Sequence, residues 1–348
     1  MSSGRWKVLL RQTLFPMNIA SFIPYIRFSK LANITLVYIG YWLSVVFKRV
    51  FIWGYPYAVS IETSAICNLR CPECPTGKNT MEREQGLLSY PDFTQLINKV
   101  EEYAVYLNLS LQGEPFLNPD LFKMIRYATD HNIYTSLSTN GHFLDSLTAV
   151  EIIQSGLKKI IISVDGTDQE TYEIYRKGGS LKKVLDGIGY LSNAKTEKQT
   201  KYPEIIIQFI VFMQNEHQIK EIQQLGIQLG ATKVELKSAQ LNGNDIGLLT
   251  TIEKFGRYSK ENKTLTIKSK LRNRCFRLWE TLVITWDSTV VPCCFDKSVQ
   301  YKIGNLKNNN LSSVWKSLAF NQFRKKILTE RKKVIICCNC TEGLRIKY

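Results

Sequence analysis

Apolar runs of strand length alternate with amphipathic stretches of helical length between residues 57 and 240. The run Ile205-Ile-Ile-Gln-Phe-Ile-Val211 is nearly all apolar, as expected of a strand buried in a parallel sheet. Such alternation predicts βαβ units and an α/β fold. The strands are expected at 57–63, 104–111, 134–138, 158–164, 204–212 and 232–238, and the helices at 90–102, 119–131, 145–155, 168–193 (broken at its glycines) and 216–229.

Polar residues follow several of these predicted strands, at the carboxyl ends where function lies on such sheets. The second strand ends in Gln112-Gly-Glu-Pro115, the third in Ser138-Thr-Asn-Gly141 and the fourth in Ser163-Val-Asp-Gly166. Gly113 would allow close approach of another backbone segment. Glu114 and nearby carbonyl groups could accept hydrogen bonds from a cationic amine.

Three further polar residues in this region each have two interpretations. Asp165 could face the site, but we interpret it as a turn or N-cap residue. Gln208 faces either the mouth of the sheet or a hydrogen-bonding partner in the core. Arg176, in Tyr175-Arg-Lys-Gly-Gly179, could grip a carboxylate bidentately or could lie on the surface before a glycine turn.

Three cysteines, Cys67, Cys71 and Cys74, directly follow the first predicted strand and lie within eight residues. A loop with this spacing can place three thiolates on three corners of a 4Fe–4S cluster, which leaves one iron without a protein ligand. A structural zinc site would need a fourth ligand, and no other Cys or His lies nearby in the sequence. The incomplete ligand set therefore predicts a reactive metal centre.

This Cys-x3-Cys-x2-Cys motif after a first strand resembles the signature of the radical S-adenosylmethionine (SAM) superfamily. The resemblance implies a six-stranded, partly open (β/α)6 barrel of the TIM-like type, because six units are too few for the closed eight-stranded barrel. Two positions depart from the family pattern: Glu73 stands where an aromatic residue often precedes the third cysteine, and Gln112 replaces a glycine. The SAM contacts that the resemblance implies are Gly113, Glu114 and Pro115 for the amino group, Ser138, Asn140 and Ser163 near the cofactor, and Arg176 for the carboxylate.

The C-terminal part contains the other six cysteines, all beyond residue 274. Two predicted strands flank a turn at Asp287-Ser288 and form a hairpin. The order of motifs resembles the SPASM or shorter twitch extension of radical SAM enzymes, which holds auxiliary iron–sulfur clusters. These motifs are Cys275-x3-Trp279, Pro292-Cys-Cys294, Gly304-Asn-Leu306 and Cys337-Cys-Asn-Cys340.

A count of cysteines limits the auxiliary site to one cluster. Two auxiliary clusters would use seven cysteines in this family, whereas only six are present here. The resemblance assigns one auxiliary 4Fe–4S cluster and leaves Cys294 and Cys338 without a role. Zinc bound by the same four thiolates is the alternative. The implied ligands are Cys275, Cys293, Cys337 and Cys340.

The N-terminal segment, residues 1–56, carries seven Lys and Arg residues and no Asp or Glu. Its apolar run Ile34–Phe47 is about 14 residues long, whereas a membrane-spanning helix needs about 20. Prolines at positions 16, 24 and 56 predict two or three short helices. Three interpretations stay open: helices packed on the barrel, an interfacial helix on an anionic membrane, and a docking surface for a protein partner or leader peptide.

The predicted organisation is an N-terminal helical segment over 1–56, a barrel over 57–240, and a linker followed by the cluster-binding extension over 241–348. At 44% apolar residues the composition is ordinary for a globular chain, and CxxC-spaced cysteines without a cleavable signal indicate metal binding in a reducing cytoplasm. A formal charge of +16 favours an acidic partner, such as an anionic membrane, an acidic substrate or an acidic electron carrier. No nucleic-acid-binding motif accompanies the charge, so nucleic acid is disfavoured.

The resemblance implies reductive cleavage of SAM at the open iron to a 5′-deoxyadenosyl radical, which abstracts hydrogen from a substrate. A flavodoxin or ferredoxin would supply the electron. We interpret the chain first as a maturase of a peptide or protein, and second as an oxidoreductase or epimerase of a sugar or lipid-linked small molecule. The non-enzyme alternative is an iron–sulfur binding module. The enzyme interpretation places the protein in the cytoplasm, with a peripheral position at the inner face of the membrane if residues 1–56 contact lipid. The sequence identifies neither the catalytic acid or base nor the substrate.

Overall fold

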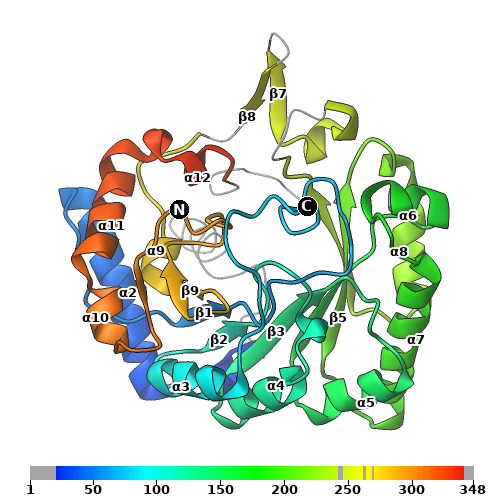
Figure 1. The fold of residues 1–348 in the computed structure, drawn as a ribbon, viewed down its shortest axis with the longest axis horizontal. Coiled ribbons are helices and arrows are strands. Elements are labelled where there is room, and N and C mark those ends of the chain that lie inside the picture. The colour runs from blue at the N-terminus through cyan, green and yellow to red at the C-terminus, as the bar shows by residue number, and fades with distance from the viewer. Residues whose placement is uncertain (1–20, 242–245, 262–263, 269, 341–348) are drawn as a thin grey trace, which may run out of the picture.

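The computed structural model describes residues 21–241, 246–261, 264–268 and 270–340. Its strands form a nine-stranded sheet, in the order β11-β10-β9-β1-β2-β3-β4-β5-β6, and a separate two-stranded sheet. Helices form an outer layer around the larger sheet, and the loop that follows β1 lies inside the ring of strands (Figure 1). The predicted partial (β/α)6 barrel is confirmed.

Six parallel strands in chain order form the barrel. Each is connected to the next through one or two helices, as the sequence pattern predicted. Side chains at the helix starts accept hydrogen bonds from the first turn, as Ser89 does from the Asp92 amide and Asp145 from the Thr148 amide. The elements are β1 (Ala58–Ile61), α3 (Tyr90–Val100), β2 (Tyr106–Asn108), α4 (Leu121–Asp130), β3 (Tyr134–Thr139), α5 (Ser146–Gln154), β4 (Lys159–Ser163), α6 (Gln169–Tyr175), α7 (Leu181–Glu197), β5 (Glu204–Val211), α8 (Ile219–Gln228) and β6 (Lys233–Ser238), with the 3₁₀ turns η3 (Pro115–Leu117) and η4 (Glu216–Gln218).

The C-terminal hairpin extends the barrel sheet on the free side of β1. Strand β9 pairs with β1 in parallel, with Ala58 opposite Thr281, and β10 pairs antiparallel with both β9 and β11. Asp287 closes the predicted turn by accepting hydrogen bonds from the Thr285 and Thr289 hydroxyl groups. The elements are α9 (Arg277–Glu280), β9 (Thr281–Ile284), β10 (Thr289–Val291), β11 (Gly304–Asn305), α10 (Leu311–Trp315), α11 (Leu318–Glu330), η7 (Arg331–Lys333) and α12 (Ile335–Cys338).

The expected linker over 241–270 contains an element that we did not predict. Besides the short 3₁₀ turns η5 (Ile246–Leu248) and η6 (Glu253–Phe255), it forms an antiparallel hairpin of β7 (Tyr258–Glu261) and β8 (Thr264–Ile267). The hairpin projects from the top of the molecule in Figure 1. Its strands are too short and too polar for the apolar pattern to have indicated them.

The prediction of two or three short N-terminal helices is wrong for the described part of that segment. After the 3₁₀ turn η2 (Ile23–Tyr25), a single helix, α2 (Phe28–Phe47), runs for 20 residues. The prolines at 24 and 56 lie outside it. By length and composition α2 could cross a membrane, so the estimate that its apolar run is too short is also wrong. Residues 1–20 lie outside the described part of the chain.

One face of α2 packs on the barrel and the C-terminal part. Lys30 Nζ lies 2.6 Å from the Ala104 carbonyl oxygen, and the Asn33 side chain bonds both the N–H and the carbonyl oxygen of Tyr55. The Tyr41 ring contacts the rings of Phe276 and Trp279 edge-on. Lys30 thus bonds to the barrel, and Asn33 bonds to the segment that leads into β1.

Candidate active site

Cys67, Cys71 and Cys74 lie together on the loop after β1, at the carboxyl end of the barrel. All three are free thiols; Cys71 is buried and the other two are half-buried. The backbone N–H of Leu69 points at Cys67 Sγ, 3.5 Å away. Burial raises the pKa of Cys67 to about 11, and the nearby Glu114, Cys71 and Cys74 add to the rise. The three sulfur atoms are therefore close enough to interact electrostatically.

This set of donors fits an iron–sulfur cluster with one open corner. The three thiols pack against the apolar side chains of Leu69, Tyr175 and Phe212. None of the three forms a disulfide. The neutral thiol is favoured there only in the absence of metal, since cluster iron binds the thiolate form. Three thiolates would hold three irons and leave the fourth for a small-molecule ligand.

Gly113 and Glu114 hold this loop against the end of β2. Gly113 has φ of +70°, and a Cβ atom there would lie 2.4 Å from the Ser64 carbonyl oxygen. The Glu114 N–H donates to the Ile66 carbonyl at 2.7 Å. The close backbone approach predicted for Gly113 is thus made to the cysteine loop itself.

The Glu114 carboxylate connects the loop to the end of β3. It is fully buried and accepts hydrogen bonds from the Thr139 hydroxyl at 2.7 Å and the Asn140 N–H at 2.8 Å. Burial raises its pKa to about 7, although these hydrogen bonds oppose the rise. The Asn140 amide in turn donates to Asn68 Oδ1 at 2.8 Å, between Cys67 and Cys71 in the chain. Glu114 therefore positions Asn140 beside the cysteines.

The interpretation of Asp165 as an N-cap or turn residue is wrong. Asp168 caps α6 through its bond with the Thr171 amide. Asp165 is completely buried and accepts hydrogen bonds from Arg176 Nε at 2.6 Å and the Ile210 N–H at 2.7 Å.

Arg176 lies inside the site and not on the surface. Its side chain is 12% exposed, and Nη1 lies 3.9 Å from Cys71 Sγ. Burial disfavours its charge, but Asp165 and the Cys71 sulfur more than offset this and raise the Arg176 pKa. Arg176 thus places a cation beside the cysteine loop, and its contact with the SAM carboxylate stays a prediction.

The other predicted SAM contacts lie at the same end of the sheet. Pro115 is buried in the 3₁₀ turn that begins after Glu114, and Ser138 lies next to the last residue of β3, with its N–H bonded to Ser110 Oγ. Ser163 is the last residue of β4 and lies opposite Gln208 of β5 in the register. Gln208 is half-buried beside these strand ends. Their contact with SAM stays a prediction.

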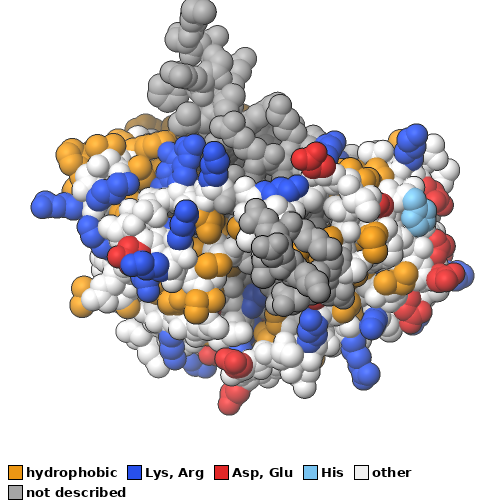
Figure 2. Space-filling view, turned by 90° about the horizontal axis from the view of Figure 1, so that it is seen from above, with side chains coloured by type: hydrophobic (Ala, Val, Ile, Leu, Met, Phe, Trp, Pro, Cys, Tyr) orange, Lys and Arg blue, Asp and Glu red, His pale blue; other side chains and the backbone are white. Residues whose placement is uncertain are grey.

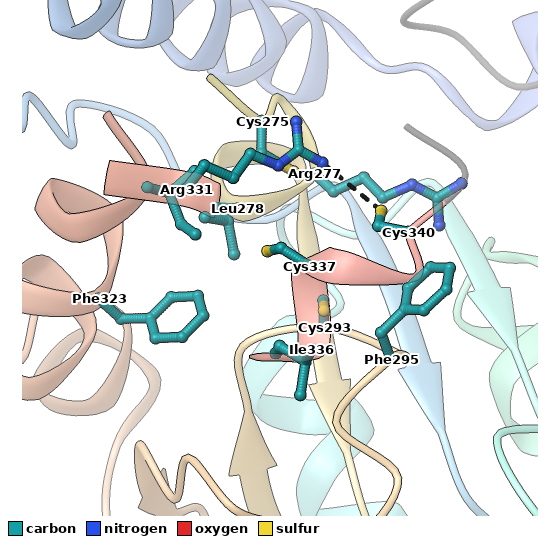
Figure 3. Close-up of a pocket in the computed structure, with 11 residues that line it drawn as sticks. Cys275, Arg277, Leu278, Cys293, Phe295, Phe323, Arg331, Ile336, Cys337 and Cys340 are labelled. Carbon is teal, nitrogen blue, oxygen red and sulfur yellow. Dashed lines mark hydrogen bonds between the residues drawn. The ribbon is translucent and has the colours of Figure 1, made fainter. Parts of the chain in front are cut away.

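Cys275, Cys293, Cys337 and Cys340 line one small pocket, although they come from segments up to 65 residues apart in sequence (Figure 3). Cys275 precedes α9, Cys293 follows β10, and the last two lie in or just after α12. Among the described residues, no three Cys, His, Asp or Glu side chains converge tightly enough to hold a single metal ion. Four thiols around a space suit a polynuclear cluster, in which iron and sulfide lie between the ligands.

A buried arginine accompanies these four thiols. Arg331 is 3% exposed, and its Nη2 atom lies 3.5 Å from Cys340 Sγ (Figure 3). Burial raises the Cys337 pKa, and the Arg331 charge opposes that rise. The two cysteines without a predicted role lie outside the pocket lining: Cys338 is exposed, with its Sγ near backbone carbonyls, and Cys294 faces Arg277 at 3.8 Å.

Residues that we did not predict connect the segment around the first cysteine loop to the segment after Cys293 and Cys294. Glu62 is completely buried at the end of β1, and its carboxylate accepts hydrogen bonds from both terminal nitrogens of Arg83, at 2.8 and 2.6 Å. Arg83 Nε donates to the Lys297 carbonyl at 2.9 Å. The backbone N–H of Trp286 also donates to the Glu62 carboxylate, at 3.3 Å. Lys297 has a lowered pKa because it is buried, and it interacts electrostatically with both Cys74 and Cys294. The sequence indicated this ion pair only through the position of Glu62, a charged residue directly after an apolar strand.

A partly open barrel with an incomplete set of three thiols at its carboxyl end and a set of four thiols beside it defines an iron–sulfur enzyme with an open coordination position. Family comparison specifies the class further. Residues 61–225 match the radical SAM superfamily, and residues 275–341 match SPASM, an iron–sulfur cluster-binding domain. The chain belongs to the radical SAM superfamily and carries a C-terminal SPASM domain. Its cofactors are SAM with a 4Fe–4S cluster, and an auxiliary iron–sulfur cluster.

Several solved structures are similar in fold. SuiB from Streptococcus suis, bound to S-adenosylmethionine, is 14% identical over 84% of this chain and 73% of its own, with a TM-score of 0.62. The protein anSMEcpe with bound AdoMet is 18% identical over 83% and 90%, with a TM-score of 0.55. BtrN in complex with AdoMet and 2-DOIA is 19% identical over 82% and 92%, with a TM-score of 0.53. At these identities the similarity shows the fold alone.

Proposed function

We propose that this radical SAM enzyme is an oxidoreductase-type maturase that modifies a peptide or protein. The observation that carries the proposal is the combination of an open three-thiol site and a four-thiol site beside one continuous sheet. A peptide substrate is supported by SuiB, which has also been solved bound to the precursor peptide SuiA; that structure is 15% identical over 85% of this chain and 71% of its own, with a TM-score of 0.60.

The residues of this chain have separate tasks in the proposed reaction. When bound, the cluster and SAM supply hydrogen-atom abstraction from an otherwise inert carbon. Cys67, Cys71 and Cys74 hold the cluster and leave one position open for SAM. Arg176, held by Asp165, gives the SAM carboxylate a fixed cation, since an arginine can bind a carboxylate bidentately.

The auxiliary site is proposed to accept an electron from the substrate or to help bind it. Arg331 places a buried cation beside its thiols. The initial electron is proposed to come from a flavodoxin or ferredoxin in the cytoplasm, and the +16 charge of the chain favours such an acidic carrier.

A second candidate substrate is a sugar or a lipid-linked small molecule, which an oxidoreductase or epimerase would modify. The observation that favours it is the exposed apolar face of α2, where Phe28 is 88% and Val46 68% exposed. Such a face would bring the enzyme near lipid.

The test has two stages, so that chemistry and substrate are judged separately. The reconstituted protein is incubated anaerobically with SAM and a chemical reductant, and 5′-deoxyadenosine is measured by mass spectrometry; no product above the Cys67→Ala, Cys71→Ala, Cys74→Ala triple variant would refute the radical chemistry. Peptide extracts of cells that express the wild type or the triple variant are then compared. A peptide that has lost two hydrogens in cells with the wild type, but not in cells with the triple variant, supports a maturase. Changes confined to small molecules would favour the second candidate.

A further inference from the structure

The outer face of α2 is apolar and open to solvent. Phe28, Leu31, Ile39, Val46 and Phe47 are 88%, 51%, 44%, 68% and 60% exposed, respectively. With 3.6 residues per turn, these five positions fall within about 160° of one another around the helix axis, which places them on one side of the helix. Figure 2 shows hydrophobic side chains among Lys and Arg side chains at the left of the molecule, the side where Figure 1 places α2 together with α10 and α11.

The opposite face of α2 is already used. Lys30, Asn33, Val37, Tyr41 and Ser44 are buried against the rest of the chain, at helical spacing. The packed side mixes polar Lys30, Asn33 and Ser44 with apolar Val37 and Tyr41, whereas the large side chains on the exposed side are apolar. A surface helix normally turns its polar face to solvent, so the exposed half of α2 lacks the environment that its composition suits.

Cations border this apolar face, and acidic residues are absent from its segment. Arg27 precedes the helix, Lys48 and Arg49 follow it, and all three are exposed. Lys325 of α11 donates a hydrogen bond to the Lys48 carbonyl and so adds a fourth cation at the same end. Residues 21–56 contain no Asp or Glu. The exposed Trp53 and Ile23 extend the surface at its two ends.

We propose that the exposed face of α2 docks on an anionic membrane surface, with the helix lying in the interface. The apolar side chains would enter the boundary between headgroups and acyl chains, while the flanking Lys and Arg would lie at the acidic headgroups. This proposal does not depend on which substrate the enzyme modifies.

A membrane-spanning position for α2 is the less favoured arrangement. To span, the helix would have to leave the barrel and break the bonds of Lys30 to the Ala104 carbonyl and of Asn33 to Tyr55. It would also expose the Trp279 and Phe276 rings that Tyr41 covers. Lying on the surface requires none of these losses.

Docking through α2 would also orient the auxiliary site. The rings of Tyr38 and Tyr41 pack on Phe276, the residue after Cys275. Trp279 Nε1 donates to the carbonyl oxygen of Phe51, just beyond the end of α2. The membrane-facing helix is therefore attached directly to the segment that supplies the first auxiliary cysteine.

The first experiment is co-sedimentation of the reconstituted full chain with vesicles. One set is phosphatidylcholine alone and the other contains phosphatidylglycerol, each at low and high salt. We expect the protein to sediment with the anionic vesicles and to be released in part by salt. The double variant Leu31→Glu, Ile39→Glu should lower the partition coefficient more than about tenfold, because it removes inserted apolar groups and adds repelling charges.

Matched variants test whether the effect is local. Leu147→Glu with Ile227→Glu makes the same chemical change at residues 77% and 79% exposed on α5 and α8, and should bind vesicles like the wild type. Circular dichroism and iron content confirm that each variant is folded. A control pair that loses binding as strongly as the α2 pair would overturn the proposal.

Three other outcomes would also overturn it. The wild type could stay in the supernatant under all four conditions. Membrane-bound protein could resist alkaline carbonate extraction, which would indicate a spanning helix. Sedimentation velocity could show a dimer that the Leu31→Glu, Ile39→Glu variant abolishes, without vesicle binding, in which case a second copy covers the face.

Discussion

The buried ion pair between Asp165 and Arg176 gives a prediction that connects stability with SAM binding. Asp165 is completely buried and the Arg176 side chain is 12% exposed, with 2.6 Å between Oδ2 and Nε. Removing one partner of a buried pair leaves an uncompensated charge and costs about 3–5 kcal/mol. Asp165→Asn keeps an acceptor for the Ile210 N–H, so its cost should fall at the lower end, about 3 kcal/mol.

A double-mutant cycle isolates the pair. Arg176→Met removes the cation and leaves the Asp165 carboxyl buried, where burial raises its pKa. Because the native state of this variant would then bind the proton more tightly than the unfolded state, its stability should fall as the pH rises above the usual Asp range. The double variant removes both charges and should be more stable than the sum of the single changes predicts, by about 2 kcal/mol.

Anaerobic urea unfolding of the apo-proteins, followed by tryptophan fluorescence, measures these differences. The exposed pair of Lys182 and Asp186, treated in the same way, should show little change. If the loss of unfolding free energy in the double variant equals the sum of the losses in the two single variants, the reasoning is refuted. In the reconstituted enzyme, Arg176→Met should keep its iron but bind SAM more weakly in equilibrium dialysis. Unchanged SAM affinity would move the search for the carboxylate partner to another cation, such as Lys237 of β6, which pairs with Glu235 at 2.9 Å.

The remaining predictions concern the clusters and one buried carboxyl group. Reconstituted protein should contain about eight iron atoms, and the Cys67, Cys71 and Cys74 triple Ala variant about half as many; equal iron contents would contradict the assignment. Cys337→Ser should lose auxiliary iron, whereas Cys338→Ser should not, because only Cys337 lines the pocket; iron and sulfide assays decide between them. Since burial raises the Glu114 pKa to about 7, the native state holds its proton more tightly than the unfolded state, and the stability of the apo-protein should fall as the pH rises from about 4.5 to 7 by on the order of 3 kcal/mol. Urea unfolding of the wild type and of Glu114→Gln across this range checks the prediction, and a parallel pH dependence of the two proteins would argue against it.

Local patterns predicted those parts of the fold that depend on local sequence. The apolar run Ile205–Val211 indicated a buried strand, and the structure has β5 there. The spacing of Cys67, Cys71 and Cys74 predicted a shared site because these residues are close in the chain. For the same reason the turn at Asp287 could be predicted from the residues around it.

Contacts between distant residues could not be predicted in this way. Asp165 was misassigned because its partners are Arg176 and the Ile210 amide, which only the folded barrel brings to it. Helix α2 begins before the apolar run Ile34–Phe47, and no local pattern marks the hydrogen bond of its Lys30 to the carbonyl of Ala104, 74 residues later. Glu62 and Arg83 went unnoticed because no spacing in the chain marks their pairing.

The pairing of β9 with β1 has a consequence for how the chain folds during synthesis. Strand β1 is made early, but Thr281, the partner of Ala58, emerges from the ribosome only after more than 200 further residues. Until then the backbone N–H and C=O groups along one edge of β1 have no partner strand, and such edges tend to pair with other chains. The cysteine loop directly follows this strand. We therefore expect chains truncated before residue 281 to aggregate, and cluster insertion at the cysteine loop to follow the pairing of β9 with β1.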